Sequence, residues 1–152
     1  MKYILNAFKL LAVMSIGVVL NSSCCKDEVI QLQDIGGAGD FRVINTTTND
    51  TINVSGGIEL GISHVLHAKN GDDVKILFIP NEKYSKYKFS VTYTLPGDKK
   101  VSPTNGYEYL YHVNGIIPGW YDMYLSASYE EDADKRQISI TSVGKVNLNI
   151  AE

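Results

Sequence analysis

The sequence predicts an all-β fold, a sandwich or a barrel, and three observations lead to this class. Apolar and polar residues alternate along several short segments, most cleanly over residues 87–95, as expected for strands with one buried face. Turn signals such as Asn-Gly and Pro-Gly separate these segments at intervals of about 8–12 residues. No stretch after residue 40 keeps a helical period over ten residues.

Length, composition and charge limit the class of protein further. The chain has 152 residues, of which 44% are hydrophobic, and this is enough for one ordinary domain. Its 14 basic and 17 acidic residues give a formal net charge of −3, which argues against a nucleic-acid partner. Two cysteines are too few for a disulfide-stapled scaffold. We therefore expect one domain that folds around an ordinary hydrophobic core.

The first half of the domain holds four expected strands. Residues 41–44 and 51–54 alternate on either side of a polar loop. Residues 64–68 lead into an Asn-Gly turn, which is a strong hairpin signal. The run over 74–79 is mostly apolar, and Pro80 ends it because proline has no N–H to donate to a sheet.

The second half holds the clearest strands and one expected irregularity. In the 87–95 segment, one face carries the apolar residues, namely Tyr87, Phe89, Val91, Tyr93 and Leu95. Alternation returns over 107–113, 121–127, 137–142 and 146–150. A bulge at Gly144 is expected to separate the last two strands.

Residues 1–23 are predicted to be a signal peptide rather than part of the fold. Lys2 and Lys9 provide a positive flank, and an uninterrupted run of low polarity follows from Leu10 to Leu20. A membrane-spanning helix needs about 20 apolar residues, and Lys9 makes this run too short. Removing these residues leaves 129, with 12 basic against 17 acidic residues and a net charge of −5.

The residues around the cysteine pair indicate a lipid anchor. The segment Leu-Asn-Ser-Ser-Cys, which ends at Cys24, resembles a bacterial lipobox, and Cys25 is a second candidate. This resemblance implies that Cys24 is acylated and becomes the mature N-terminus. The following Lys26, Asp27 and Glu28 resemble the surface-export signal of Bacteroidetes-type lipoproteins. The other interpretation of these three residues is a solvated charge run.

Three segments follow from these features. Residues 1–23 are the lipoprotein signal peptide, residues 24–40 are expected to be a flexible tether, and residues 41–152 are expected to be the folded domain. The tether assignment depends on the three glycines between residues 36 and 39.

A second resemblance concerns the fold of the domain. The segment Ile-Ile-Pro-Gly-Trp-Tyr-Asp-Met-Tyr-Leu-Ser-Ala, residues 116–127, resembles the E–F corner and F strand of immunoglobulin-like sandwiches, most of all PKD and fibronectin type III domains. It implies that the Tyr121 hydroxyl bonds to backbone near the corner. Residues 70–76 are similar to the turn into a B strand. The resemblance covers about residues 61–150, so residues 41–60 are expected to be extra strands or an extension.

Aromatic residues supply the candidate binding site. Tyr107, Tyr109 and Tyr111 share one face of an expected strand, while Trp120 and Tyr124 lie on the outward side of another. Such side chains stack on sugar rings or form protein contacts, and the alternative is core and cross-strand packing. Trp120 is the best exposed candidate because the alternate residues after it are apolar and claim the inward face.

No chemical motif points to catalysis or a metal. His64 and His67 form an HxxH pair, but on a strand they point to opposite faces. The acidic run 130–134 is expected to be a solvated loop tip rather than a calcium site. No catalytic residue, metal ligand or cofactor is predicted. Thr51, in an Asp-Thr-Ile sequence, matches the acceptor pattern of periplasmic O-glycosylation in the same bacterial group.

Together these features predict a lipid-anchored, non-enzymatic binding or structural accessory of the bacterial outer membrane, exposed at the cell surface. Its expected partners are the membrane, through the N-terminal lipid, and a glycan or a protein. The alternative is an assembly or immunity lipoprotein that faces the periplasm and binds a protein partner. Hydrolase activity has the least support.

Overall fold

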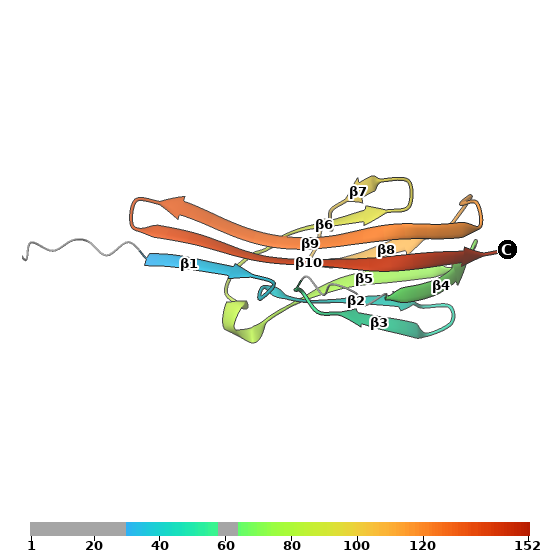
Figure 1. Ribbon diagram of the computed structural model, residues 1–152, viewed down its shortest axis with the longest axis horizontal. Helices are drawn as coiled ribbons and strands as arrows, with labels where there is room; N and C mark the ends of the chain where they lie inside the picture. Colours follow the sequence, from blue (N-terminus) through green and yellow to red (C-terminus); the bar gives the residue numbers. More distant parts are fainter. Residues whose placement is uncertain (1–29, 58–63) are drawn as a thin grey trace, which may run out of the picture.

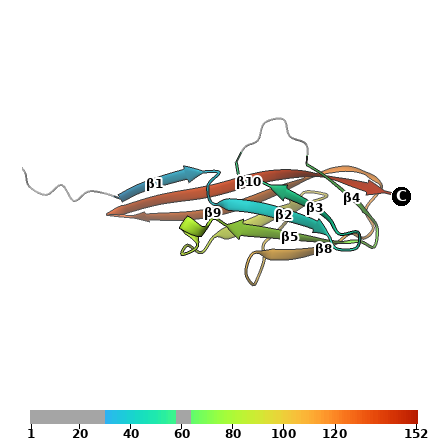
Figure 2. The same ribbon diagram turned by 90° about the horizontal axis from the view of Figure 1, so that it is seen from below.

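The computed structural model describes residues 30–57 and 64–152, and in this part of the chain the protein is an all-β sandwich of two sheets (Figures 1 and 2). The predicted signal peptide, Cys24, Cys25 and the predicted export signal Lys26–Asp27–Glu28 lie outside the described residues. None of the helical segments within the described ranges is long and apolar enough to span a bilayer. The predicted fold class, an immunoglobulin-like β-sandwich, is confirmed.

One sheet contains the long C-terminal strands. Its order is β1-β10-β9-β6-β7, and β4 also pairs with β10. The bounds of its members are β1 Ile30–Ile35, β4 Val65–Lys69, β6 Ser90–Leu95, β7 Lys99–Val101, β9 Gly119–Ala133 and β10 Arg136–Ala151.

The second sheet is shorter and has the order β3-β2-β5-β8. Its strands are β2 Gly39–Asn45, β3 Asp50–Val54, β5 Asp73–Pro80 and β8 Glu108–His112. A 3₁₀ turn, η1 Glu82–Tyr84, follows β5. Asn81 is its N-cap, and the Asn81 side chain accepts a hydrogen bond from the Lys83 N–H. Apolar side chains of the two sheets fill the space between them, with Phe41, Phe78 and Tyr93 fully buried.

The strand pairing has the immunoglobulin-like pattern. β5 and β8 pair in one sheet, while β6, β9 and β10 lie in the other, as strands B and E face strands C, F and G in that fold. The expected tyrosine corner is present, because the Tyr121 hydroxyl donates to the Ile117 carbonyl oxygen at 2.6 Å. The hairpin of β2 and β3 extends the second sheet beyond β5, which confirms that residues 41–60 include extra strands.

The expected tether over 24–40 is wrong for its second half. Residues 30–35 form β1, which runs parallel to β10 from the Ile30–Arg136 pair to the Ile35–Thr141 pair. The Tyr84 hydroxyl donates to Asp34 Oδ2 at 2.5 Å, and Lys83 Nζ lies 2.9 Å from the same oxygen, so β1 is fastened to the body. The following glycines form a sharp crossover between sheets. Gly36, with φ +87°, adopts a left-handed backbone there.

The expected bulge at Gly144 is also absent. β9 and β10 pair without interruption through 15 residue pairs, and Gly144 lies opposite Leu125. Its α-carbon faces the second sheet, where a Cβ atom would lie 2.8 Å from Val54 Cγ1 and 3.3 Å from Phe41 Cδ2. The glycine therefore makes room for the opposite sheet rather than marking an extra residue.

The Asn-Gly sequence at 70–71 forms a turn, but the turn does not make a hairpin. β4 pairs with β10, and β5 pairs with β2 and β8, so the turn carries the chain from one sheet to the other. Asp72 is 2% exposed and its Oδ2 accepts from Asn45 Nδ2 at 2.8 Å and from the Lys69 N–H at 3.1 Å. The turn therefore forms as its local sequence predicts, whereas distant residues determine which strands β4 and β5 pair with.

Candidate functional site

The outward face of β9 carries the two most relevant aromatic side chains. Trp120 is 64% exposed and Tyr124 is 49% exposed, while Met123 and Leu125 between and beside them are buried. This alternation is a consequence of the two-residue period of a strand. Four residues along a strand correspond to about 13 Å, so the two rings form separate contact points on one face.

Cross-strand register surrounds these rings with polar groups. Asn149 on β10 lies opposite Trp120, and His67 on β4 lies next to Asn149. Opposite Tyr124 on β10 is Lys145. The sequence alone does not indicate these neighbours, because only the register of β9, β10 and β4 brings them to the aromatic pair.

Tyr124 is held in place by a charged pair. Lys145 Nζ lies 2.8 Å from Asp122 Oδ2, and the Tyr124 hydroxyl donates to the same oxygen at 3.3 Å. The Lys145 ammonium also lies 5.6 Å from the centre of the Tyr124 ring, within cation–π range. The hydrogen bond to Asp122 raises the pKa of Lys145, so the ammonium stays charged at neutral pH. The ring is therefore oriented before any ligand arrives.

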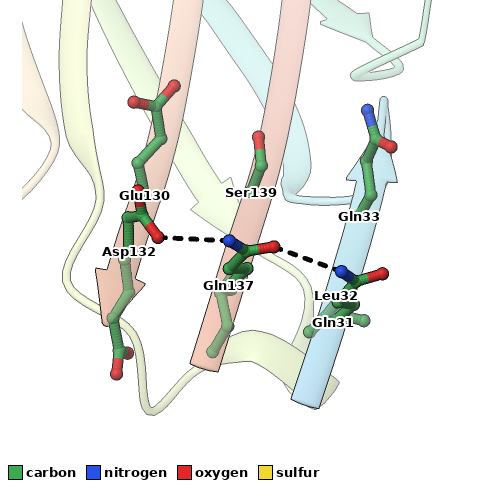
Figure 3. A pocket seen from close by; sticks show the side chains of 9 residues that line it. Gln31, Leu32, Gln33, Glu130, Asp132, Gln137 and Ser139 are labelled. Carbon is green, nitrogen blue, oxygen red and sulfur yellow. Dashed lines mark hydrogen bonds between the residues drawn. The ribbon is translucent and has the colours of Figure 1, made fainter. Parts of the chain in front are cut away.

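A shallow groove occupies the other end of the same sheet (Figure 3). It has a volume of about 530 Å³ and lies across β1, β10 and β9. Gln31 Nε2 donates to Gln137 Oε1 at 3.2 Å, and Gln137 Nε2 donates to Asp132 Oδ1 at 3.4 Å, which forms one polar row across three strands. The neighbouring row places the short Ser139 side chain between its cross-strand partners, Gln33 and Glu130.

The acidic run 130–134, expected to be a solvated hairpin tip, lies only in part in the turn. β9 continues to Ala133 and β10 begins at Arg136, so only Asp134 of the run belongs to the tight turn. Residues 130–132 lie on β9 and point alternately to its two sides, and Glu130 and Asp132 line the groove. Among residues 30–57 and 64–152, no three His, Cys, Asp or Glu side chains are grouped in a way that would hold a metal ion.

The three tyrosines at β8 do not join the Trp120 face. Tyr109 and Tyr111 belong to β8 of the second sheet, and Tyr107 directly precedes this strand. All three are partly buried and pack against the core. The Tyr107 hydroxyl accepts from the Phe89 N–H at 3.1 Å, and the rings of Tyr107 and Phe78 are 5.5 Å apart. Burial also raises the pKa of Tyr111. Of the two interpretations that the sequence left open for these tyrosines, a binding face or core and cross-strand packing, the structure shows packing, because their side chains point inward.

Thr51 remains a candidate for modification. It lies on β3, opposite Ile44 in β2, and its side chain is exposed. β3 has a neighbour on one side only in the described sheet, so an enzyme has access to this strand. The O-glycosylation prediction therefore stays a prediction.

Comparison of the chain with known protein families, curated proteins and solved structures gives no match. The functional interpretation consequently depends on the chemistry of this face and on the sequence features before the domain.

Proposed function

We propose that the protein is a lipid-anchored binding accessory of the bacterial outer membrane, exposed at the cell surface, which binds a glycan through the face that carries Trp120 and Tyr124. The observation that carries this proposal is the pair of exposed aromatic rings on one outward strand face, with a cross-strand amide beside Trp120 and a pre-formed charged pair beside Tyr124.

The residue types suit a sugar ligand. An exposed ring offers a flat apolar surface for the C–H face of a sugar, and buries a large area at little cost in side-chain entropy. The Asn149 amide and the Asp122 carboxylate lie beside the rings and offer donors and acceptors for hydroxyl groups. A few placed polar groups around aromatic contact points are typical of small-molecule sites.

The start of the described chain fits an anchor at Cys24. Ile30 begins β1 beside Arg136, at the β9–β10 turn, where Figure 1 places one end of the long axis. A segment from Cys24 to Ile30 spans at most about 20 Å. Under this proposal, the β9–β10 turn is the end of the domain nearest the membrane, and Trp120 is far from it.

A glycan array probed with the soluble domain tests the binding part of the proposal. Trp120→Ala is expected to weaken any binding by about 30-fold, because loss of a central aromatic contact costs about 2 kcal/mol. Leu110→Ala is the matched control, since Leu110 is 55% exposed but lies on β8 in the other sheet. Binding that survives Trp120→Ala unchanged contradicts the proposed site.

Two experiments in cells test the anchor and the location. Cys24→Ala is expected to abolish labelling by a radioactive fatty acid, whereas Cys25→Ala retains it, and the reverse result moves the anchor to Cys25. Protease treatment of intact cells is expected to release the domain. Full protection of the wild-type domain from the protease favours the alternative of a periplasm-facing lipoprotein that binds a protein. If the wild type is cleaved, but a variant with alanine at Lys26, Asp27 and Glu28 is protected, the result supports the export signal.

A further inference from the structure

The aromatic pair and the polar groove lie on one continuous face. The even-numbered residues of β9, from Trp120 to Asp132, and the odd-numbered residues of β10, from Gln137 to Asn149, are paired with one another in an unbroken ladder. Residues of the same parity in such a ladder share a side of the sheet. Twelve residues along β9 correspond to about 40 Å, and Figure 1 shows β9 and β10 side by side over most of the length of the molecule.

Short hydroxyl side chains occupy the middle of this face. The pairs Thr141–Ser128 and Val143–Ser126 separate the groove from the Lys145–Tyr124 pair. Thr92 of β6 continues the row of Ser126. Bulky side chains therefore stand at the two ends, and a low strip of hydroxyl groups, interrupted by the 40% exposed Val143, joins them.

The charge of the face selects among ligands that are long enough to use it. On β9 and β10 its carboxylates are Asp122, Glu130 and Asp132, and its ammonium group, Lys145, is already paired with Asp122. Lys100 of β7 shares this side through Thr94 but lies at the aromatic end, away from the groove. A polyanion would meet like charge at the groove, which is unfavourable for association. A chain of neutral hydroxyl-bearing units instead finds amides, hydroxyls and carboxylates that all form hydrogen bonds with it.

We infer that the ligand is an extended, neutral polysaccharide chain that lies along β9 and β10, with one part stacked on Trp120 and Tyr124 and another in the groove at Gln137 and Ser139. This inference rests on the proposed function and adds the class and length of the glycan. A short oligosaccharide contacts the aromatic end alone. A chain that reaches the groove gains the second set of hydrogen bonds without a second loss of translational freedom, so its affinity is higher.

The test uses the soluble domain and four neutral polysaccharides: dextran, mannan, xylan and starch. Each is first embedded in a native gel, and retardation by at least one is expected. Trimers and longer fractions of the retarding polysaccharide are then titrated by calorimetry. Fractions long enough to span both ends are expected to bind at least tenfold more tightly than trimers.

Ser139→Trp is the decisive variant, because it places a large side chain in the groove and leaves the aromatic end unchanged. It is expected to remove the length-dependent gain without altering trimer affinity, whereas Trp120→Ala is expected to weaken binding of both trimers and long fractions by about 30-fold. Leu110→Trp adds the same bulk to the other sheet and is expected to change neither. Gln137→Ala removes only one polar group of the groove and is expected to reduce the length-dependent gain in affinity. This variant keeps the test valid if Ser139→Trp does not fold.

The outcomes separate the two proposals. Equal affinity for trimers and long fractions, or an unchanged gain in both groove variants, overturns the extended-chain inference and leaves glycan binding standing. The extended-chain inference is also overturned if none of the four polysaccharides retards the domain and the array shows binding only to short or charged glycans. An array without any glycan signal overturns the proposed function itself, and capture of an extended peptide instead would favour the protein-binding alternative.

Discussion

Gly56 lies where three backbone segments meet, and its replacement by alanine is expected to destabilise the fold strongly. The Gly56 carbonyl accepts from the Val143 N–H at 3.1 Å, between the part of β10 that pairs with β1 and the part that pairs with β4. A Cβ atom at residue 56 would overlap the Gly39 carbonyl oxygen and lie 2.6 Å from Ser142 Cβ. The Gly39 N–H in turn donates to Ser142 Oγ at 3.1 Å.

The expected size of the effect follows from what the new methyl group meets. Overpacking a well-packed interior costs about 1–3 kcal/mol. We expect Gly56→Ala to lower the free energy of unfolding by about 3 kcal/mol, at the upper end of this range, because a backbone carbonyl cannot rotate away as a flexible side chain does. With about 2.1 cal/mol/K per residue of unfolding entropy, a domain of about 120 residues loses about 12 °C in Tm.

Gly57→Ala is the matched control for this prediction. No described atom lies within 4 Å of a Cβ at Gly57. Alanine there is expected to be neutral or to stabilise by up to about 1 kcal/mol, through the lower entropy of the unfolded chain. Thermal unfolding of both variants, followed by far-ultraviolet circular dichroism, gives the comparison. The reasoning is refuted if Gly56→Ala melts within about 3 °C of the wild type, or if both variants lose the same stability.

Three further changes test other parts of the fold. Asn45→Ala removes a hydrogen bond to the buried Asp72 carboxylate and is expected to cost about 2–3 kcal/mol in urea unfolding; a loss below about 0.5 kcal/mol would contradict this. Tyr84→Phe removes the main cause of the lowered pKa of Asp34. The ionised Asp34 carboxyl stabilises the fold fully above its unfolded pKa of about 3.8, and this contribution is lost as the pH falls through its lower folded pKa. The variant should therefore be less stable than the wild type at pH 7 and approach the wild type's stability in strong acid. An equal deficit at both pH values argues against this bond. Tyr121→Phe removes the corner hydrogen bond and should lower stability by about 1 kcal/mol without changing the denaturant m-value.

The features that the sequence predicts correctly depend on local pattern. Alternation from Phe89 to Leu95 places these side chains in the core, where Phe89, Val91, Tyr93 and Leu95 are at most 5% exposed. The turn before Tyr121 is also local, and its hydroxyl bond spans four residues. In both cases the strand period and the turn residues carry the necessary information, so no distant partner is needed.

The features that the sequence does not predict depend on distant partners. β1 pairs with a strand that is 106 residues away, from Ile30 to Arg136, and nothing in its own composition identifies that partner. The glycines between residues 36 and 39 are compatible with a flexible tether and also with a tight crossover, because the wide conformational range of glycine suits both structures. At the candidate site, alternation identified Trp120, but the opposing Asn149 follows only from the pairing of two long strands.

Gly144 links the fold to the proposed function. A bulge inserts one residue and reverses the side to which all later side chains of a strand point. With a bulge at residue 144, Gln137 and Asn149 would lie on opposite sides of the sheet. A glycine instead fits beneath Val54 and Phe41 without an extra residue, and the ladder stays continuous. The small size of this one residue therefore allows the aromatic end and the groove to lie on one face, as the proposed binding of an extended chain requires.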